Sequence, residues 1–294
     1  MQNAIELLRR GEPIVFPTET VYGLGAPVFN EQAVRRVFEI KGRPIDNPLI
    51  VHVSNFSQIE RLALEIPPSF YLLASRFWPG PLTLVVKRHP QVPAIVSAGH
   101  PTIAIRMPSH PMALQLIEAF GEPLVAPSAN LSGRPSPTTA ADAREDLEGK
   151  VSLILDGGPC SVGIESTVLS LVHSTPTLLR PGQITQGQLE EVLGEKIGLP
   201  PKDGPILSPG MKYRHYAPKA ALRLVYDPKE LKAPFILSAE PLPGTHPLSP
   251  QTLYASLRRA DRLGVSAIDI YCNAAVQSNA ALMNRLLRAS GALI

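Results

Sequence analysis

The sequence predicts an α/β protein of two unequal domains: a large mixed-sheet domain over residues 1–203, a linker over 204–220 and a small α/β domain over 221–294. Short apolar runs alternate with helical patterns along the first 200 residues, which is typical of α/β domains. Several of these runs follow one another too closely for the crossovers that parallel strands need, so a mixed sheet is favoured over a parallel one. A stretch rich in proline and glycine, without periodicity, then interrupts the alternation.

The large domain is predicted to hold many short strands and a few helices. The predicted strands are residues 13–16, 49–53, 82–86, 103–107, 123–126, 152–155, 167–172 and 177–179, and the predicted helices are 31–40, 57–64 and 185–193. Ser57 and Glu60 have the spacing of a capping box at the start of the second helix. Thr185 and Gln188 repeat that spacing at the start of the third.

The linker has a composition that is unusual for an idle spacer. Spacers are commonly rich in Gly and Ser or stiffened by Pro. This one reads DGPILSPGMKYRHYAPK and carries two cations, a histidine and two tyrosines from Lys212 to Tyr216. Beyond it, residues 221–226, 235–237 and 266–271 are predicted strands and residues 274–288 a helix. Ser249 followed by Pro250 predicts the start of one more helix, which completes a small α/β domain.

Composition and charge exclude several classes of protein. No apolar run approaches the roughly 18 residues of a membrane span, and the N-terminus MQNAIELLRR lacks the pattern of a signal peptide. The two cysteines, Cys160 and Cys272, form no CxxC pair, so we expect no disulfide framework. The net charge is +3, with 20 basic and 20 acidic residues before residue 222, which argues against a broad polyanion-binding surface. We therefore expect a reduced cytoplasmic protein.

Familiar catalytic motifs are absent from the sequence. It contains no GxxxxGK(S/T) phosphate loop, no GxGxxG, no HExxH and no Gly-x-Ser-x-Gly. The seven histidines show no metal-ligand spacing. If the protein is an enzyme, it lacks a familiar nucleophile and a familiar metal cage.

Polar clusters instead accompany the predicted strands. In PTETVYGLG, residues 17–25, Thr18, Thr20 and Tyr22 occupy alternate positions, so an extended chain places their three hydroxyls on one side. Such a row can hold a small polar ligand. An ordinary β-turn broken by glycines explains the same residues equally well.

The segment KGRPIDNPL places two cations, Lys41 and Arg43, around Gly42, which is suited to end a helix. The cations can complement the helix dipole, or they can bind phosphate, Lys as a point charge and Arg as a fork. Dipole complementation does not require Asn47, so the phosphate interpretation is favoured. His52 follows in an apolar strand, where it is either a hydrogen-bonded core residue or a ligand contact.

Two further arginines lie in or beside apolar strands. Arg106 is in the middle of one, where an arginine is costly unless it is paired or faces a cleft. Arg180 ends another, and the serine-rich loop 126–138 follows a third. That loop is a plain turn in isolation, but loops at strand ends are where α/β ligand sites form. With Lys41 and Arg43, these arginines predict one concave anion site in a neutral domain, suited to a nucleotide phosphate chain.

Taken in order, the motifs PTETVYGLG, KGRPIDNPLIVHV, SANLSGRPSPT, ESTV, RPG and SPGMKYRHYAP resemble those of the Sua5/YrdC family. The resemblance is dense over residues 10–219, and the SPGMKYRHYAP linker is typical of the two-domain Sua5 form. It implies a YrdC-like twisted mixed-sheet domain, the linker, and a small Rossmann-like α/β C-terminal domain.

The resemblance implies a nucleotidyltransferase that makes threonylcarbamoyl-AMP and pyrophosphate from L-threonine, bicarbonate and ATP. Mg²⁺ is expected on the ATP phosphates, with no protein metal ligand. The product is expected to pass to the tRNA threonylcarbamoyl-transfer machinery. That machinery forms N6-threonylcarbamoyladenosine at position 37 of tRNAs that read codons starting with A.

Site residues follow from the same resemblance. It implies catalytic roles for Lys41 and Arg43. Threonine binding is implied for Thr20, His52, Arg106, Ala126 and Ser166, and ATP binding for Arg43, Asn47, Thr102, Ser128, Ser136, Arg180 and Tyr216. Arg106 is suited to bind the threonine carboxylate bidentately. His52 is suited to orient the substrate amine or to accept its proton, and orientation is favoured over general-base work. Tyr216 and its neighbours are suited to close over the nucleotide as a lid.

Two alternative functions use the same residues. A YrdC-like fold with a basic cleft could bind double-stranded RNA or tRNA, at least weakly, but the neutral charge of the large domain disfavours this. A related domain occurs in carbamoyl-transfer maturation enzymes, which act on another substrate. Those enzymes carry additional acylphosphatase and zinc-finger-like segments, and this chain has two cysteines and no such segment.

Overall fold

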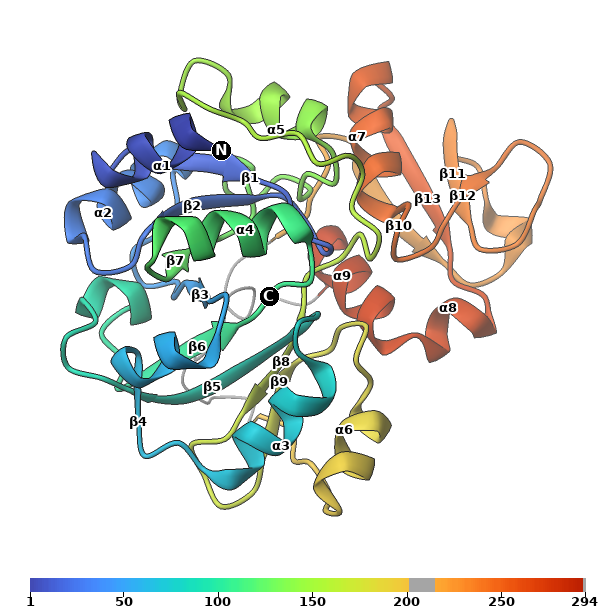
Figure 1. The fold of residues 1–294 in the computed structure, drawn as a ribbon. Helices are drawn as coiled ribbons and strands as arrows, with labels where there is room; N and C mark the ends of the chain where they lie inside the picture. The colour runs from blue at the N-terminus through green and yellow to red at the C-terminus, as the bar shows by residue number, and fades with distance from the viewer. Residues whose placement is uncertain (201–214, 293–294) are drawn as a thin grey trace.

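A mixed sheet of nine strands organises the first domain in the computed structural model, which describes residues 1–200 and 215–292 (Figure 1). The strands are β1 (Ile14–Phe16), β2 (Gly23–Pro27), β3 (Ile50–His52), β4 (Ala63–Leu64), β5 (Leu82–Arg88), β6 (Thr102–Arg106), β7 (Leu124–Val125), β8 (Thr167–Ser170) and β9 (Thr177–Arg180). Their order is β1-β2-β7-β3-β6-β5-β8-β9, with β4 paired to β5. β3 runs parallel to β6 and β5 parallel to β8, while the other pairs are antiparallel. The predicted mixed sheet is therefore confirmed.

The two faces of this sheet have different surroundings. The helices of the domain are α1 (Gln2–Arg9), α2 (Glu31–Lys41), α3 (Pro68–Phe77), α4 (Pro111–Phe120), α5 (Ala140–Leu147) and α6 (Gln186–Leu193), with 3-10 turns η1 (Phe56–Arg61) and η2 (Ala94–Ser97). Val51, Ile105 and Leu169 pack with residues of α2, α3, α5 and α6 in the main hydrophobic core. Alternate residues of a strand point the opposite way. His52 and Arg106, which are register partners, therefore lie on the second face of the sheet.

The second domain is a small α/β unit with a fully parallel sheet. Its strands are β10 (Ala221–Val225), β11 (Phe235–Ser238), β12 (His246–Pro247) and β13 (Ala267–Tyr271), in the order β10-β13-β11-β12. Its helices are α7 (Leu253–Leu263), α8 (Ala274–Ser278) and α9 (Ala280–Ser290), with a 3-10 turn η3 (Pro228–Glu230). This arrangement confirms the predicted Rossmann-like fold class. In the residues described, no helix combines the length and apolarity needed to cross a bilayer.

The two domains are joined by a buried ion pair, a partly exposed ion pair and a shared apolar core. Arg258 of α7 donates to Asp146 of α5 at 3.0 Å, and Arg262, one turn later, donates to Glu145 at 2.7 Å. Ile164 of the first domain belongs to the hydrophobic core of the second. Helix α9 lies beside the first domain (Figure 1). The interface therefore places C-terminal side chains next to the large sheet.

Most of the predicted linker, 204–214, lies outside the described residues. Its described end, residues 215–220, contacts both domains. The Ala217 N–H donates to the Gly133 carbonyl at 2.9 Å, and the Lys219 N–H donates to Asp261 of α7 at 2.8 Å.

Two local predictions for the first domain are wrong. Residues 57–64 form the 3-10 turn η1 and the short strand β4 instead of an α-helix, and Asn55 rather than Ser57 caps the turn. Residues 152–155 form only an isolated bridge, because Val15 alone supplies backbone partners for them. Helices α1, α3, α4 and α5 and strand β2 have no counterpart among the predicted elements.

Two predictions for the second domain also need correction. The helix expected over residues 274–288 is two helices, because Asn279 breaks it and caps α9 by accepting the Leu282 N–H at 3.0 Å. Ser249 does not cap a helix: α7 begins three residues after Pro250, with Thr252 as its N-cap. The Ser249 hydroxyl instead bonds the Thr252 hydroxyl at 3.0 Å in the preceding turn.

Candidate active site

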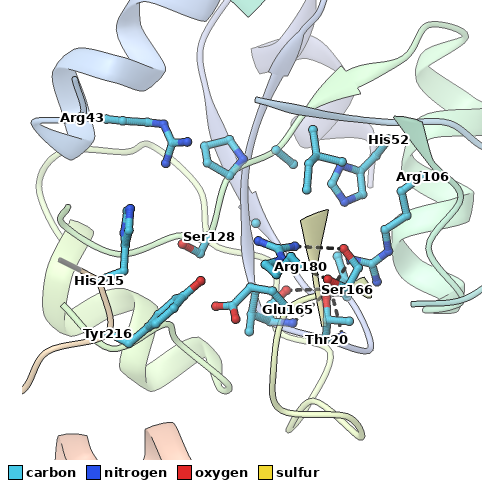
Figure 2. Close-up of a pocket in the computed structure, with 16 residues that line it drawn as sticks. Thr20, Arg43, His52, Arg106, Ser128, Glu165, Ser166, Arg180, His215 and Tyr216 are labelled. Atoms are coloured by element: carbon cyan, nitrogen blue, oxygen red, sulfur yellow. Dashed lines mark hydrogen bonds between the residues drawn. The ribbon is translucent and has the colours of Figure 1, made fainter. Parts of the chain in front are cut away.

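A pocket lies on the second face of the large sheet, between β3, β6, the starts of two loops and the described end of the linker (Figure 2). It is lined by Thr18, Thr20, Val21, Gly23, Arg43, Ile50, His52, Arg106, Ala126, Pro127, Ser128, Glu165, Ser166, Arg180, His215 and Tyr216. All five residues that the family resemblance assigns to threonine are in this set. Of the residues assigned to ATP, the pocket includes Arg43, Ser128, Arg180 and Tyr216.

Arg106 is held at one end of the pocket by three protein acceptors. Its guanidinium donates to Thr20 Oγ1 at 2.8 Å, to Glu19 Oε1 at 2.5 Å and to the Gly80 carbonyl at 3.2 Å. These bonds use three of the five N–H donors of an arginine. Glu19 is 6% exposed and also accepts the Ser109 N–H, so it fixes the guanidinium and offsets part of its charge. The sequence analysis did not identify Glu19.

The predicted row of three hydroxyls is correct for two of its members. Thr18 Oγ1 and Thr20 Oγ1 lie 2.9 Å apart and both line the pocket. Tyr22 departs from the row, because the chain turns before β2 begins, and its hydroxyl donates to the Gly158 carbonyl at 2.6 Å. Burial, with help from the nearby Asp156 carboxylate, raises the pKa of Tyr22 to about 12.

His52 is a neutral, buried imidazole beside Arg106. It is 3% exposed, and its Nδ1 has no hydrogen-bond partner among the described residues. Burial, with a smaller contribution from the positive charge of Arg106, lowers its pKa from 6.5 to about 3. A neutral imidazole of such low basicity can orient a ligand by hydrogen bonding but is a weak general base near neutral pH.

Ser166 and Arg180 form the floor of the pocket. Arg180 donates through Nε to the Ser166 carbonyl at 3.0 Å and through Nη2 to the Ser166 hydroxyl at 3.1 Å. The same hydroxyl bonds the Thr83 hydroxyl at 2.7 Å. A Cβ at Gly182 would lie 2.3 Å from the backbone nitrogen of Thr167, so the RPG turn packs directly on the ESTV segment.

Arg43 enters the pocket from the loop after α2. Gly42 ends that helix in the left-handed conformation, with φ 59°, as predicted. Arg43 donates to the carbonyls of Asn47 at 3.1 Å and Pro48 at 2.8 Å. Burial lowers its pKa to about 10, with a further contribution from the neighbouring Arg180, so it is positively charged at neutral pH.

Lys41 does not line the pocket. Its side chain is buried, and Nζ donates to the carbonyls of Ser128 at 2.5 Å and Asn130 at 2.6 Å. Burial, then repulsion from Arg43, lowers its pKa well below the usual range. In this structure the lysine supports the loop that presents Ser128, instead of facing the ligand space.

The other three residues assigned to ATP lie behind the pocket lining. Asn47 is 1% exposed, and neither atom of its side-chain amide has a partner among the described residues. Thr102 shares a strand face with Arg106, four residues earlier on β6. Ser136 donates to Glu165 Oε1 at 2.6 Å, so it reaches the pocket through that carboxylate.

Two titratable lining residues, Glu165 and His215, were not among the predicted site residues. Glu165 adjoins Ser166 in the ESTV motif and is buried with three side-chain hydrogen-bond donors around it. Burial lowers the pKa of His215 to about 3, with contributions from Arg43 and Arg288, and its Nε2 has no partner in the described part of the chain. Both residues lie inside motifs that supplied other predicted site residues, Glu165 in ESTV and His215 in SPGMKYRHYAP.

The charge of the pocket suits an anionic ligand. Among the described residues, three arginines and one carboxylate line it, and the arginines lie at different positions around the ligand space (Figure 2). Hydroxyl groups and neutral imidazoles make up most of the remaining polar surface. Across residues 1–200 and 215–292, no group of three or more His, Cys, Asp and Glu side chains could hold a metal ion.

Both domains match known protein families, and the chain is similar to characterised proteins over most of its length. The Sua5/YciO/YrdC family, described as "Telomere recombination", matches residues 6–182, and a family described as "Threonylcarbamoyl-AMP synthase, C-terminal domain" matches residues 184–242. A threonylcarbamoyl-AMP synthase of Pyrococcus abyssi is 44% identical over 319 residues, which cover 98% of this chain and 93% of that protein. Another from Bacillus subtilis is 52% identical over 225 residues, which cover 75% of this chain and 65% of that protein.

Solved structures agree with these sequence matches. The crystal structure of P. abyssi Sua5 complexed with L-threonine superposes with a TM-score of 0.91 at 42% identity, covering 99% of this chain and 94% of that one. The crystal structure of E. coli YciO superposes with a TM-score of 0.55 at 29% identity, covering 62% of this chain and 88% of that one.

Proposed function

Because this chain belongs to the Sua5/YciO/YrdC family and has threonylcarbamoyl-AMP synthase activity, we propose that L-threonine, bicarbonate and ATP react in the pocket of Figure 2. The observation that carries this proposal is the grouping of three arginines around one ligand space that also holds Ser166 and His52. Such a pocket can bind a carboxylate at one end and a phosphate chain at the other.

The chemistry needs no nucleophile from the protein. The threonine amine adds to bicarbonate with loss of water and gives a carbamate. A carbamate oxygen then attacks the α-phosphorus of ATP, and pyrophosphate leaves as the P–O bond to the β-phosphate breaks. Both nucleophiles belong to substrates, so the task of the protein is to position them and to stabilise negative charge.

Threonine is proposed to bind at the Arg106 end. Three of the five guanidinium donors hold Thr20, Glu19 and Gly80, and the other two can bind the threonine carboxylate. The neutral His52 imidazole, beside that guanidinium, is suited to orient the substrate amine.

ATP is proposed to bind between Arg43 and Arg180, with Tyr216 covering it from the linker side. Arg43, Arg180 and Ser128 line this part of the pocket, and the two guanidiniums can stabilise charge that develops on the phosphates. Asn47 has a buried, unpartnered amide next to the carbonyl that Arg43 contacts, which suits it to a polar ligand group. Lys41 is proposed to act by supporting the Ser128 loop.

Mg²⁺ is proposed to enter with ATP, held by phosphate oxygens and water. This is the usual coordination of Mg²⁺ in sites that bind nucleotide phosphates. When bound, it supplies positive charge to the phosphate chain. Arg43 and Arg180, which line this part of the pocket, would bind other oxygens of the same phosphate chain.

The cellular role is proposed from the product. Threonylcarbamoyl-AMP is a reactive mixed anhydride, and we propose that it passes to the tRNA threonylcarbamoyl-transfer machinery in the cytoplasm. There it would serve the N6-threonylcarbamoyl modification of adenosine 37 in tRNAs that read codons starting with A.

Pyrophosphate release with each substrate omitted in turn tests this function. The full chain is expected to release pyrophosphate only when threonine, bicarbonate and Mg·ATP are all present. Mass spectrometry is expected to detect threonylcarbamoyl-AMP in the same reactions. Pyrophosphate release that continues without threonine would contradict the proposed substrate set.

A further inference from the structure

The C-terminal domain contacts the pocket through Glu165, a lining residue that belongs to the first domain. Its Oε1 accepts the Ser136 hydroxyl at 2.6 Å within the first domain. Its Oε2 accepts the Tyr254 hydroxyl from α7 and Arg285 Nε from α9, both at 2.8 Å. A single carboxylate that lines the pocket therefore receives two hydrogen bonds from the second domain.

Arg285 also bonds the backbone on both sides of the pocket floor. Its Nη2 donates to the Glu165 carbonyl at 3.1 Å, and its Nη1 donates to the Pro181 carbonyl at 2.9 Å. Glu165 precedes Ser166, and Pro181 follows Arg180. One fully buried guanidinium thus connects the two segments that carry the Ser166–Arg180 contact.

The linker tyrosine rests on the same two C-terminal side chains. The ring of Tyr216 lies 5.4 Å from that of Tyr254, and the Arg285 guanidinium lies 5.7 Å from the Tyr216 ring centroid. Tyr216 has a φ of 66°, a left-handed conformation that is strained for a residue with a side chain. The contacts of its buried ring with the second domain compensate for this conformation. The ring therefore packs against the second domain, and Tyr216 lines the pocket from that side.

Stability alone is a weak explanation for this arrangement. A buried ion pair contributes little net stability compared with well-packed apolar residues of similar volume. The domains are already joined by the pairs of Arg258 and Arg262 and by an apolar core. Arg285 differs from those arginines because the carboxylate it contacts lines the pocket.

We propose that Arg285 is a positioning residue of the synthase site, which acts through Glu165 and the Pro181 carbonyl to hold Ser166, Arg180 and Tyr216 in place. The C-terminal domain is therefore part of the active site. The proposal rests on the proposed function, because it concerns the same pocket.

Substitutions at Arg285 separate its charge from its shape. Arg285→Gln removes the charge, whereas Arg285→Lys keeps the charge and loses the fork that spans Glu165 and Pro181. Arg262→Gln is the matched control, because it cuts the interdomain ion pairs with Glu145 and Asp142 without touching Glu165. Each full-length variant is assayed for pyrophosphate release across pH 5.5–8.5 with varied Mg·ATP, and its unfolding midpoint is measured by circular dichroism.

We expect both Arg285 variants to lose about tenfold or more in kcat/KM for ATP, because a buried charge network is broken. Arg262→Gln is expected to stay within about twofold of the wild type, since a partly exposed pair contributes little.

The pH profile distinguishes positioning from a structural role. Among the described residues, the charged and titratable groups that face Glu165 are Arg285, Tyr254, Arg180, Tyr216 and His215, with the hydroxyl of Ser136. Burial by itself raises the pKa of Glu165, but Arg285 and Arg180 together bring it below the usual value. In Arg285→Gln, the carboxylate is expected to protonate at higher pH, so activity falls on the acid side. Arg285→Lys is expected to keep the wild-type profile, and Arg285→Gln/Glu165→Gln is expected to show no such acid limb.

Tyr254→Phe covers the case in which Arg285→Gln does not fold. It removes one hydrogen bond to Glu165, keeps the ring that packs on Tyr216, and is expected to raise KM for ATP about fivefold. Wild-type kcat/KM and pH profiles in a folded Arg285→Gln would overturn the inference, as would an unchanged KM in Tyr254→Phe. Failure of the wild type to release pyrophosphate would instead reject the proposed function.

Discussion

Replacing Arg106 by lysine tests how threonine is held, because it keeps the charge and changes the geometry. In the structure the guanidinium is 4% exposed and fixed by Thr20, Glu19 and Gly80. Lysine has three N–H donors on one atom, against five in a planar fork for arginine. After Thr20 and Glu19 are satisfied, one donor at most is left for a substrate carboxylate.

The size of the effect follows from that donor count. The wild-type guanidinium has two donors beyond its three protein contacts, so Arg106→Lys removes at least one charge-assisted bond to the ligand. Such a bond contributes about 1.5–3 kcal/mol, which corresponds to a roughly 10- to 150-fold higher Kd for threonine. The effect on ATP binding is expected to be small, because Arg43 and Arg180 lie elsewhere in the pocket.

Isothermal titration of threonine into the full-length protein measures this Kd directly. Arg88→Lys is the matched control, since Arg88 lies on β5 of the same sheet, donates to the carbonyls of His100 and Val92, and does not line the pocket. It is expected to leave the threonine Kd within about twofold of wild type. An unchanged Kd in a folded Arg106→Lys, or an equal loss in Arg88→Lys, would refute the reasoning.

Three other substitutions give independent checks. Lys41→Met removes the buried ammonium that donates to two loop carbonyls, so the free energy of unfolding in urea is expected to fall by about 2–4 kcal/mol. An unchanged unfolding midpoint together with impaired ATP use would contradict this role. Gly182→Ala puts a Cβ 2.3 Å from the Thr167 nitrogen and should abolish pyrophosphate release, whereas Gly187→Ala, with open space around it, should not. Burial lowers the pKa of His52 from 6.5 to about 3, so below pH 6.5 the unfolded chain binds a proton at this histidine that the folded protein does not. The contribution of His52 to the unfolding free energy is therefore complete above pH 6.5 and declines as the pH falls. The unfolding free energy of the wild type should therefore fall between pH 7 and pH 5 by about 2 kcal/mol more than that of His52→Gln. If both proteins lose the same amount, His52 is not buried in its neutral form.

Local sequence features predicted the local structure well. Gly42 ends α2 and Thr185 starts α6 with a complete capping box, because both signals depend on residues within one helical turn. Arg106 stood out in an apolar strand, and the structure places it in the pocket. The same approach failed at residues 57–64, where Asn55, not Ser57, supplies the cap and the turn stays 3-10.

What the sequence by itself determined is the fold class, the order of the motifs and the residue types available for an anion site. Only the tertiary structure decided which of those residues meet. Glu165 and Arg285 are 120 positions apart and bond at 2.8 Å, and Lys41, predicted to face phosphate, supports a loop 87 positions away. Periodicity and capping are set by neighbours along the chain, whereas the partner of a buried charge is set by the packing of distant segments, and no local pattern encodes that packing.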